Sequence, residues 1–172
     1  MPEKLDIGMS AKEFAECFLI AFFIAFIMFR VLFGISVING PSMNDTLSNG
    51  DVVFLRRVGY TPAYGDIIFA DCDGLNEVIV KRVIGLPGDI IEIDEETACV
   101  YRNGEPLIED YLGSATTTSA DMNGPVEVKE NCVFVMGDNR QNSHDSRYDI
   151  VGQIPYDHIV GKYVRTLISS WN

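Results

Sequence analysis

The chain has 172 residues, of which 47% are hydrophobic and 22% are charged, and its formal net charge is -12 at pH 7. This length suits one modest domain with an appendage, and the composition is that of a folded protein rather than a disordered one. The 25 Asp and Glu residues outnumber the 13 Lys and Arg residues, which argues against a nucleic-acid partner because phosphate contacts need clustered basic side chains.

An apolar segment near the N-terminus predicts a membrane helix. No charge interrupts the run from Cys17 to Phe29, and apolar residues continue beyond Arg30 as far as Ile38. A membrane span needs about 17 to 20 apolar residues, a length that this segment reaches when Arg30 extends its charge to the interface. A cleaved signal peptide or a core helix of a soluble protein is the alternative.

The sequence after Ile38 predicts a compact, mostly antiparallel β domain, because short β-branched runs alternate with turn residues. The expected strands are residues 52–56, 66–70, 77–84, 90–94, 98–102, 132–136 and 159–168. Residues 113–124, rich in Ser, Thr and Ala, lack periodicity and predict an exposed loop.

The cysteines do not form an obvious set of pairs. Cys17 lies in the apolar run, which leaves Cys72, Cys99 and Cys132 as an odd number elsewhere. One disulfide among them is compatible with a compartment outside the cytosol, but free buried thiols are the favoured interpretation. Their spacing resembles no metal site.

Three segments combine turn residues with reactive side chains: NGPSMNDTL from residue 39, VKRVIGLPGD from residue 80 and GDNRQNSHDSR from residue 137. The hydroxyl of Ser42 in the first segment is a poor nucleophile until a base within about 3 Å removes its proton. The chain has two histidines, His144 and His158, so a Ser/His/Asp triad remains open as an alternative.

Lys81 is the stronger candidate for the base. Apolar residues 78–80 precede it, and strand alternation sends its neighbour Arg82 to the opposite face of the sheet. Burial disfavours the ammonium form and lowers the pKa of a lysine, which leaves a neutral amine able to deprotonate Ser42.

In amino-acid sequence and in order along the chain, the three segments resemble the motifs of the type I signal peptidases, which are GxSMxPTL, KRxxGxPGD and GDNRxxSxDSR. These enzymes are the bacterial leader peptidases with a Ser/Lys dyad. The resemblance covers nearly the whole chain, including GDVVF, GDIIF, YRNGEPLIEDYL and IVGKYV, and the size is similar to that of compact Gram-positive members. It implies a mostly β fold, an antiparallel sheet or partial barrel with one N-terminal transmembrane helix, and a small inserted lobe at about residues 95–131.

The resemblance also implies the activity, a membrane-bound serine endopeptidase that removes signal peptides from secreted preproteins. It makes Ser42 the acylating nucleophile, Lys81 the general base and Ser143 the residue that orients the lysine amine by a hydrogen bond. The residues implied to line the substrate pocket are Ile38, Met43, Leu47 and Val80. The residues implied to brace the site by ion pairs are Asp138, Asp145 and Arg147.

By the same resemblance, residues 1–12 form a cytoplasmic tail, 13–34 the anchor and 35–172 an extracytoplasmic catalytic domain on the plasma membrane. The expected partners are preproteins and the lipid bilayer, and no cofactor or metal is expected. Two positions depart from the family pattern. Asp45 stands where proline is common, and Gly40 stands where some members have a serine that donates to the oxyanion, so the second oxyanion donor is unassigned.

Two other functions stay open at this point. One is a cytosolic Ser/Lys autoprotease of the repressor type, which has a related β fold but lacks a membrane helix. The other is a membrane-anchored β module that binds preproteins or pilins without cleaving them.

Overall fold

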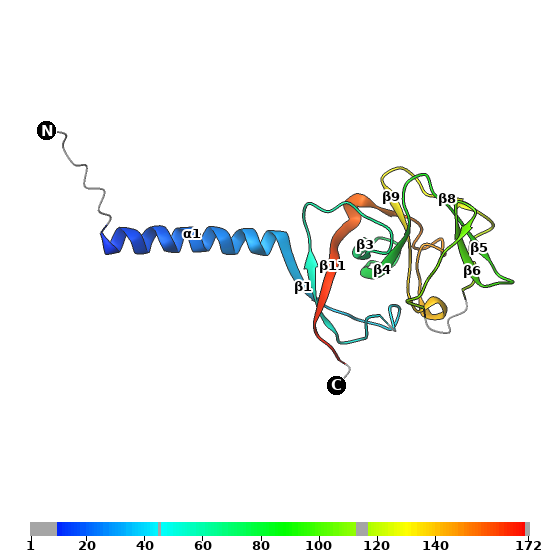
Figure 1. Ribbon diagram of the computed structural model, residues 1–172, viewed down its shortest axis with the longest axis horizontal. Helices are drawn as coiled ribbons and strands as arrows, with labels where there is room; N and C mark the ends of the chain where they lie inside the picture. The colour runs from blue at the N-terminus through cyan, green and yellow to red at the C-terminus, as the bar shows by residue number, and fades with distance from the viewer. Residues whose placement is uncertain (1–9, 45, 113–116, 171–172) are drawn as a thin grey trace.

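The computed structural model describes residues 10–44, 46–112 and 117–170. It begins with α1 (Ala11–Leu32), whose first turn is closed by a capping box between Ser10 and Glu13. The helix projects away from the β domain (Figure 1), and none of its residues is buried. Its 22 residues are long and apolar enough to cross a membrane. The helix covers most of the predicted anchor and ends slightly earlier, because the chain becomes extended at Phe33.

The described strands form two antiparallel sheets, which agrees with the predicted fold class. The larger sheet has the order β1 (Phe33–Val37), β2 (Val52–Arg56), β11 (Ile159–Ile168), β3 (Ile67–Cys72), β4 (Glu77–Gly85), β9 (Cys132–Met136) and β10 (Ile154–Pro155). The smaller sheet has the order β7 (Glu105–Pro106), β6 (Cys99–Arg102), β5 (Ile90–Asp94) and β8 (Val126–Glu127). Two short 3₁₀ helices, η1 (Arg140–Asn142) and η2 (Tyr156–His158), complete the described elements. The inserted lobe therefore begins at β5, a few residues before the expected boundary.

The strand predictions fail where a strand is short or lies beside the anchor. The sequence pattern missed β7, β8 and β10, each only two residues long, because so short a segment has no measurable periodicity. It also missed β1, since FGISV continues the apolar character of the helix without a turn signal. The predicted strands 52–56, 90–94, 132–136 and 159–168 have the observed bounds.

The central strands of the larger sheet are buried on both faces. On β3, Ile68 and Ala70 belong to one core cluster, whereas Ile67 and Phe69 belong to another. A further cluster, which includes Ile91, joins the smaller sheet to the larger one. Because both faces are covered there, side chains on either face of β4 are buried from Lys81 to Gly85.

The expectation of an exposed loop at 113–124 is wrong for part of it. Residues 113–116 lie outside the described residues, but Thr117 is 1% exposed and Met122 packs against the cluster around Ile91. Polar composition predicted exposure, whereas the lobe covers this segment. Cys72, Cys99 and Cys132 are free thiols, as favoured, but only Cys72 is buried, since Cys99 and Cys132 are partly exposed.

Candidate active site

Ser42 and Lys81 meet although 39 positions separate them in the sequence. Lys81 Nζ donates a hydrogen bond of 2.9 Å to Ser42 Oγ. Ser42 lies in the loop between β1 and β2, and Lys81 lies near the middle of β4. The arrangement pairs an alcohol with an amine that is only 4% exposed, which is the geometry that an activated serine needs.

The loop that carries Ser42 is fixed from both ends. Gly40 has a φ of 95°, a left-handed conformation that other residues rarely adopt, and its N–H donates to Asn49 Oδ1 at 2.9 Å. Beyond Ser42 the N–H groups of Thr46 and Leu47 both donate to the carbonyl of Met43, which closes a single helical turn. The nucleophile therefore sits on a short, internally bonded loop rather than on a free one.

The environment of Lys81 favours its neutral form. Burial lowers the pKa of the Lys81 amine, while the negative charges of Asp145 and Glu77 oppose this shift. The positive charge of Arg147 acts in the same direction as burial. The net effect is a pKa below the usual value for lysine, so the desolvation of the amine outweighs its acidic neighbours.

Ser143 does not make the hydrogen bond that was predicted for it. Its hydroxyl donates to Asp145 Oδ2 at 2.8 Å, and within the described part of the chain no hydrogen bond joins it to Lys81. The buried carboxylate of Asp145 also accepts from the N–H of Gly137 at 2.9 Å. A carboxylate is a stronger acceptor than an amine that is already bonded to Ser42, which explains why the hydroxyl turns to it.

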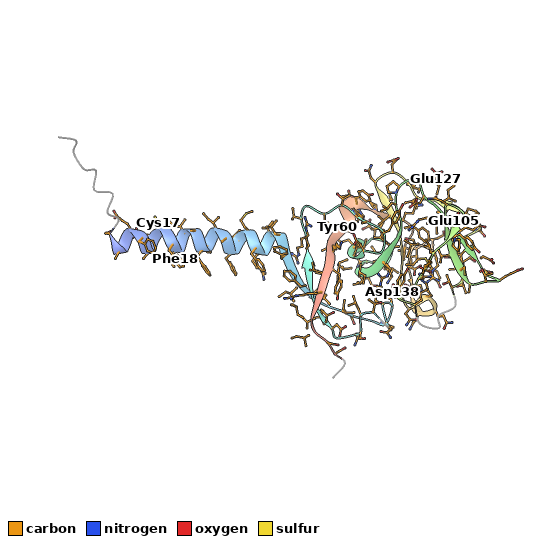
Figure 2. The ribbon with its side chains drawn as sticks, in the orientation of Figure 1. Cys17, Phe18, Tyr60, Glu105, Glu127 and Asp138 are labelled. Atoms are coloured by element: carbon orange, nitrogen blue, oxygen red, sulfur yellow. The ribbon has the colours of Figure 1, made fainter. Side chains whose placement is uncertain are left out.

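The ion pairs join the three reactive segments to one another. Asp138 receives two hydrogen bonds from Arg82, at 2.8 and 2.6 Å, and a third from the Thr46 hydroxyl at 2.5 Å. Asp145 pairs with Arg147 at 2.8 Å, and both side chains are fully buried. Figure 2 shows Asp138 inside the domain, far from α1. These pairs hold the loop of Ser42 against β4 and against the segment after β9.

Two residues that the sequence reasoning missed touch the nucleophile directly. The Asn139 N–H donates to the Ser42 carbonyl at 3.0 Å, and its side-chain amide donates to the Pro41 carbonyl at 3.0 Å. A Cβ added to Gly137 would lie 2.5 Å from the Ser42 carbonyl oxygen and 2.2 Å from Ser143 Oγ. The signal for both positions was their place in the motif GDNRxxSxDSR, to which no role for Gly137 or Asn139 had been assigned.

A further buried cation connects the smaller lobe to this network. The fully buried side chain of Arg140 forms an ion pair with Glu109 and donates to the Thr117 hydroxyl at 3.0 Å. The ring of Tyr111 lies 3.9 Å from the Arg82 guanidinium, a cation–π contact. The stretch containing Glu109 and Tyr111 had only supported the family resemblance, and it covers the ion pairs behind the active site.

A cavity of about 200 Å³ opens beside the dyad, between the end of β1 and the first half of β4. Ile38, Met43 and Val80 line it together with Ser42 and Lys81. The prediction for Leu47 is wrong. Leu47 is 1% exposed and packs in the core with Val53 and Leu55, so it supports the cavity from behind without lining it.

The remaining candidates lie away from this chemistry or outside the described residues. His144 is exposed and stacks edge-on against Tyr148, and His158 contacts the Asp71 carbonyl at 3.3 Å. In the described part of the chain neither histidine hydrogen-bonds to Ser42, so the geometry does not support a histidine triad. Asp45 lies outside the described residues.

Comparison with known proteins places this site in a family. Residues 11–168 match the model of the family described as signal peptidase, peptidase S26. The chain belongs to this family. S26 signal peptidases are membrane-bound serine proteases that remove signal peptides, and the resemblance found in the sequence is thereby confirmed.

Individual signal peptidases agree with the family model. The chain is 38% identical to signal peptidase I S of Bacillus subtilis (strain 168) over 156 residues, which cover 84% of this chain and 83% of the relative. It is 37% identical to signal peptidase I of Bacillus licheniformis over 148 residues, which cover 80% of this chain and 78% of the relative. A crystal structure of a signal peptidase I from Enterococcus faecalis V583 matches with a TM-score of 0.51 and 31% identity, covering 61% of this chain and 98% of that one.

Proposed function

We propose that Ser42 and Lys81 form the catalytic dyad with which this signal peptidase cleaves preproteins. The observation that carries the proposal is the 2.9 Å contact between Lys81 Nζ and Ser42 Oγ at a buried amine. When the amine is neutral, its lone pair accepts the Ser42 proton while Oγ attacks the scissile carbonyl carbon. The resulting ammonium then protonates the leaving amine, and an acyl-enzyme remains on Ser42.

The second half of the reaction uses the same groups. Lys81, neutral again after the leaving amine departs with its proton, removes a proton from water as the water attacks the ester. The tetrahedral oxyanion is met by the backbone N–H of Ser42, because Pro41 lacks only its own N–H donor. Collapse of this intermediate returns the proton to Ser42 Oγ and releases the signal peptide with a free carboxylate.

The main chain around the cavity supports binding of an extended substrate. In the described sheet β1 pairs only with β2, so its other edge is free. β4 pairs with β9 only from Arg82 onward, which leaves the groove side of residues 77–81 unpaired. A peptide laid between these two edges adds a strand by main-chain hydrogen bonds and brings its scissile carbonyl to Ser42. Ile38, Met43 and Val80 then contact small side chains before the cut.

The membrane helix supports the choice of substrate. α1 leads directly into β1, which forms one wall of the cavity, so the site lies close to the bilayer that α1 is apolar enough to cross. Enzyme and signal peptide share that bilayer, which raises their effective concentration and limits their relative orientation. The proposal places residues 1–12 in the cytoplasm and the catalytic domain on the extracytoplasmic side.

The buried polar residues around the dyad have positioning roles in this proposal. Asp138 and Asp145 hold Arg82 and Arg147, and these pairs keep the catalytic segments in register. Ser143, held by Asp145 and packed against Gly137, supports the segment that lies against the Ser42 carbonyl. None of these residues transfers a proton in the reaction.

The decisive experiment measures cleavage of a preprotein by the full chain in lipid vesicles. Ser42→Ala and Lys81→Ala should each lower kcat/KM by roughly 10³-fold or more, because one removes the nucleophile and the other its base. Circular dichroism should show an unchanged fold. Ser119→Ala and Lys129→Ala, which change the same residue types in the small lobe and just before β9, serve as controls with normal activity.

Substantial activity in either dyad variant would refute the dyad. An unaltered chain that binds the preprotein without producing any cleaved product would instead favour the non-cleaving module.

A further inference from the structure

Asn139 holds the peptide groups on both sides of the nucleophile. Its backbone N–H donates to the Ser42 carbonyl, and its side-chain amide donates to the Pro41 carbonyl, both at 3.0 Å. The first carbonyl belongs to the peptide group that follows the Cα of Ser42, and the second belongs to the group that precedes it. A single residue from the segment after β9 therefore acts on the direction of both groups.

The contact to Pro41 acts on the group that carries the oxyanion donor. A trans peptide group is planar, and its C=O and N–H bonds point in opposite directions. The Pro41 carbonyl and the Ser42 N–H belong to one such group, so a hydrogen bond that fixes the carbonyl also sets the direction of the N–H. In the described part of the chain the Ser42 N–H donates to no backbone carbonyl. It is therefore available to the oxyanion of a tetrahedral intermediate.

The contact to Ser42 acts on the group that a turn of this kind can rotate. The Pro41 carbonyl also accepts from the Asn44 N–H at 2.9 Å, which closes a four-residue turn with Ser42 and Met43 at its centre. The two commonest turn types differ mainly in the direction of the central peptide group, here the one between Ser42 and Met43. The carbonyl of that group is the one bonded to the Asn139 N–H, so this bond holds the turn in one form.

Asn139 reaches the nucleophile from the side away from the groove. Ser42 and Lys81 line the cavity beside the dyad, whereas Pro41 and Asn139 are not among the described residues that line it. The Asn139 side chain is also not hydrogen-bonded to Lys81 within the described residues, since its amide bonds to Pro41. It can therefore influence the reaction only through the loop of Ser42, and not by touching the substrate or the base.

Asn139 is itself fixed, because it lies between two buried ion pairs. Its neighbour Asp138 is 3% exposed and pairs with Arg82, and its neighbour Arg140 is 2% exposed and pairs with Glu109. Both pairs lead to other parts of the fold, one to β4 and the other to the smaller lobe. An anchor held in this way can set the direction of a donor before the substrate arrives, which is the condition for electrostatic preorganisation.

We propose that Asn139 is a positioning residue for the oxyanion hole, which aims the Ser42 N–H by fixing the carbonyls of Pro41 and Ser42. This inference rests on the proposed role of Ser42 as the nucleophile. The Asn139 side chain transfers no proton and contacts no reacting atom. A donor aimed in advance stabilises the anionic intermediate more than the neutral carbonyl of the substrate. Loss of the side chain therefore slows the chemical step and leaves substrate binding unchanged.

Steady-state kinetics of Asn139→Ala test the proposal, with the full chain in lipid vesicles and a short peptide substrate. Removal of a whole oxyanion donor lowers kcat by about 10² to 10³, whereas this variant keeps the Ser42 N–H and loses only its alignment. We therefore expect kcat to fall by roughly 10-fold to 100-fold, with KM nearly unchanged. Asn142→Ala is the matched control with normal activity, because its exposed side chain lies in the neighbouring 3₁₀ helix.

A peptide aldehyde that ends at the cleavage position measures the oxyanion contact separately from turnover. Ser42 Oγ bonds to the aldehyde carbon, the C=O electron pair moves to its oxygen as an oxyanion, and the Ser42 proton passes to Lys81. The inhibition constant of the aldehyde should rise in Asn139→Ala by the same factor by which kcat falls. The affinity for the cleaved signal peptide, which forms no oxyanion, should not change. The acidic limb of the pH profile of kcat/KM should also stay in place, because Lys81 is untouched.

Three results would overturn the positioning role: equal affinity of Asn139→Ala and the unaltered protein for the aldehyde, a loss confined to KM, or a shifted acidic limb. Asn139→Leu, which has a similar shape but no donor, should give the same losses and serves if the alanine variant does not fold. An unaltered chain that cleaves no peptide and forms no aldehyde adduct would refute the dyad itself. Normal cleavage with no effect of either Asn139 variant would refute the positioning role alone.

Discussion

The two faces of β4 place neighbouring cations in opposite situations. Lys81 and Arg82 are both buried, with exposed fractions of 4% and 9%. The guanidinium of Arg82 donates two hydrogen bonds to the Asp138 carboxylate, which balances its charge. It donates another to the Gly65 carbonyl. Lys81 contacts only the neutral hydroxyl of Ser42 among the hydrogen-bonding side chains of the described residues. One strand thus carries a cation stabilised as a charge and an amine whose pKa is lowered by burial.

The difference shows how burial is used for structure on one face and for chemistry on the other. A buried charge must be paired, because an unpaired one costs several kcal/mol or loses its proton. The guanidinium of Arg82 cannot give up its proton in a protein, so pairing is its only solution. The amine of Lys81 can, and a neutral amine is what the proposed dyad needs. If the two residue types were exchanged, an arginine at position 81 could not become neutral. A lysine at position 82 could not form the two parallel hydrogen bonds to Asp138.

The largest expected effect is that of Lys81→Met on activity. Cleavage should fall by roughly 10³-fold or more, because Met fills the same space but cannot accept a proton. The free energy of unfolding should stay the same or increase. The folded pKa of Lys81 is lower than its value of 10.5 in the unfolded chain, so between the two values only the unfolded state binds this proton and stability rises with pH. At lower pH the native protein must carry the buried charge, a cost that Met removes.

Thermal unfolding in detergent, followed from pH 6 to pH 10, should then show a weaker pH dependence in Lys81→Met than in the unaltered protein. A variant that is inactive because it unfolds would contradict this interpretation.

Arg82→Met should show the reverse pattern. The substitution leaves the Asp138 carboxylate buried without its partner, which typically costs about 3 to 5 kcal/mol of stability. Lys162→Met breaks a partly exposed pair with Asp66 and should cost less than about 1 kcal/mol. Chemical denaturation of the three proteins measures both values. If the two variants are equally stable, the ion pair between Arg82 and Asp138 does not have the structural role assigned to it.

Gly137→Ala should have a smaller effect, mainly on kcat. The added methyl group would meet the Ser42 carbonyl and the Ser143 hydroxyl at 2.5 and 2.2 Å, so the nucleophile or its neighbour must move. A displacement on the order of 1 Å in the loop of the nucleophile should lower kcat by about 100-fold. Gly34→Ala is the control, since its methyl group would meet only the flexible side chain of Arg57. Steady-state kinetics with a short peptide distinguishes kcat from KM, and an unchanged kcat would show that the site tolerates the shift.

The sequence predicted the dyad because the type and local sequence context of each member indicate its chemistry. A serine in a turn, and a lysine preceded by an apolar run on a strand, are both readable from the chain, and the structure brings them together. The position of Leu47 was not readable, because an apolar side chain looks the same whether it lines a cavity or supports it from behind. Only the paths of β2 and the preceding loop decide that it lies with Val53 and Leu55.

The partner of Ser143 was also beyond the sequence. Asp145 is two positions away, but its carboxylate reaches Ser143 only because Gly137 and Arg147 hold it in place from other directions. Likewise, Arg82 could be assigned to the face opposite Lys81, but its burial could not, since coverage of that face depends on Asp138 and on Tyr111 of the lobe. Local pattern gives the direction of a side chain, and the tertiary fold gives its surroundings.

The smallest expected effect is that of Glu77→Gln, which tests how neighbouring charge sets the pKa of Lys81. Glu77, at the exposed start of β4, raises the pKa of Lys81 by its negative charge and so opposes the effect of burial. Glu77→Gln should therefore lower the pKa of Lys81 further and increase the fraction of neutral amine at any given pH. Because activity requires the neutral form, the acidic limb of the pH profile of kcat/KM should move to lower pH. A short uncharged peptide substrate avoids a direct effect of Glu77 on binding.

The shift should be present at low ionic strength and should shrink in about 1 M salt, because an exposed carboxylate is screened from the amine. Glu127→Gln, at an exposed position in the smaller sheet, removes the same charge far from Lys81 and should leave the profile unchanged. A shift of the Glu77→Gln profile to higher pH, or no shift at low ionic strength, would contradict the assignment of this limb to the Lys81 amine, because loss of a neighbouring negative charge lowers the pKa of that amine.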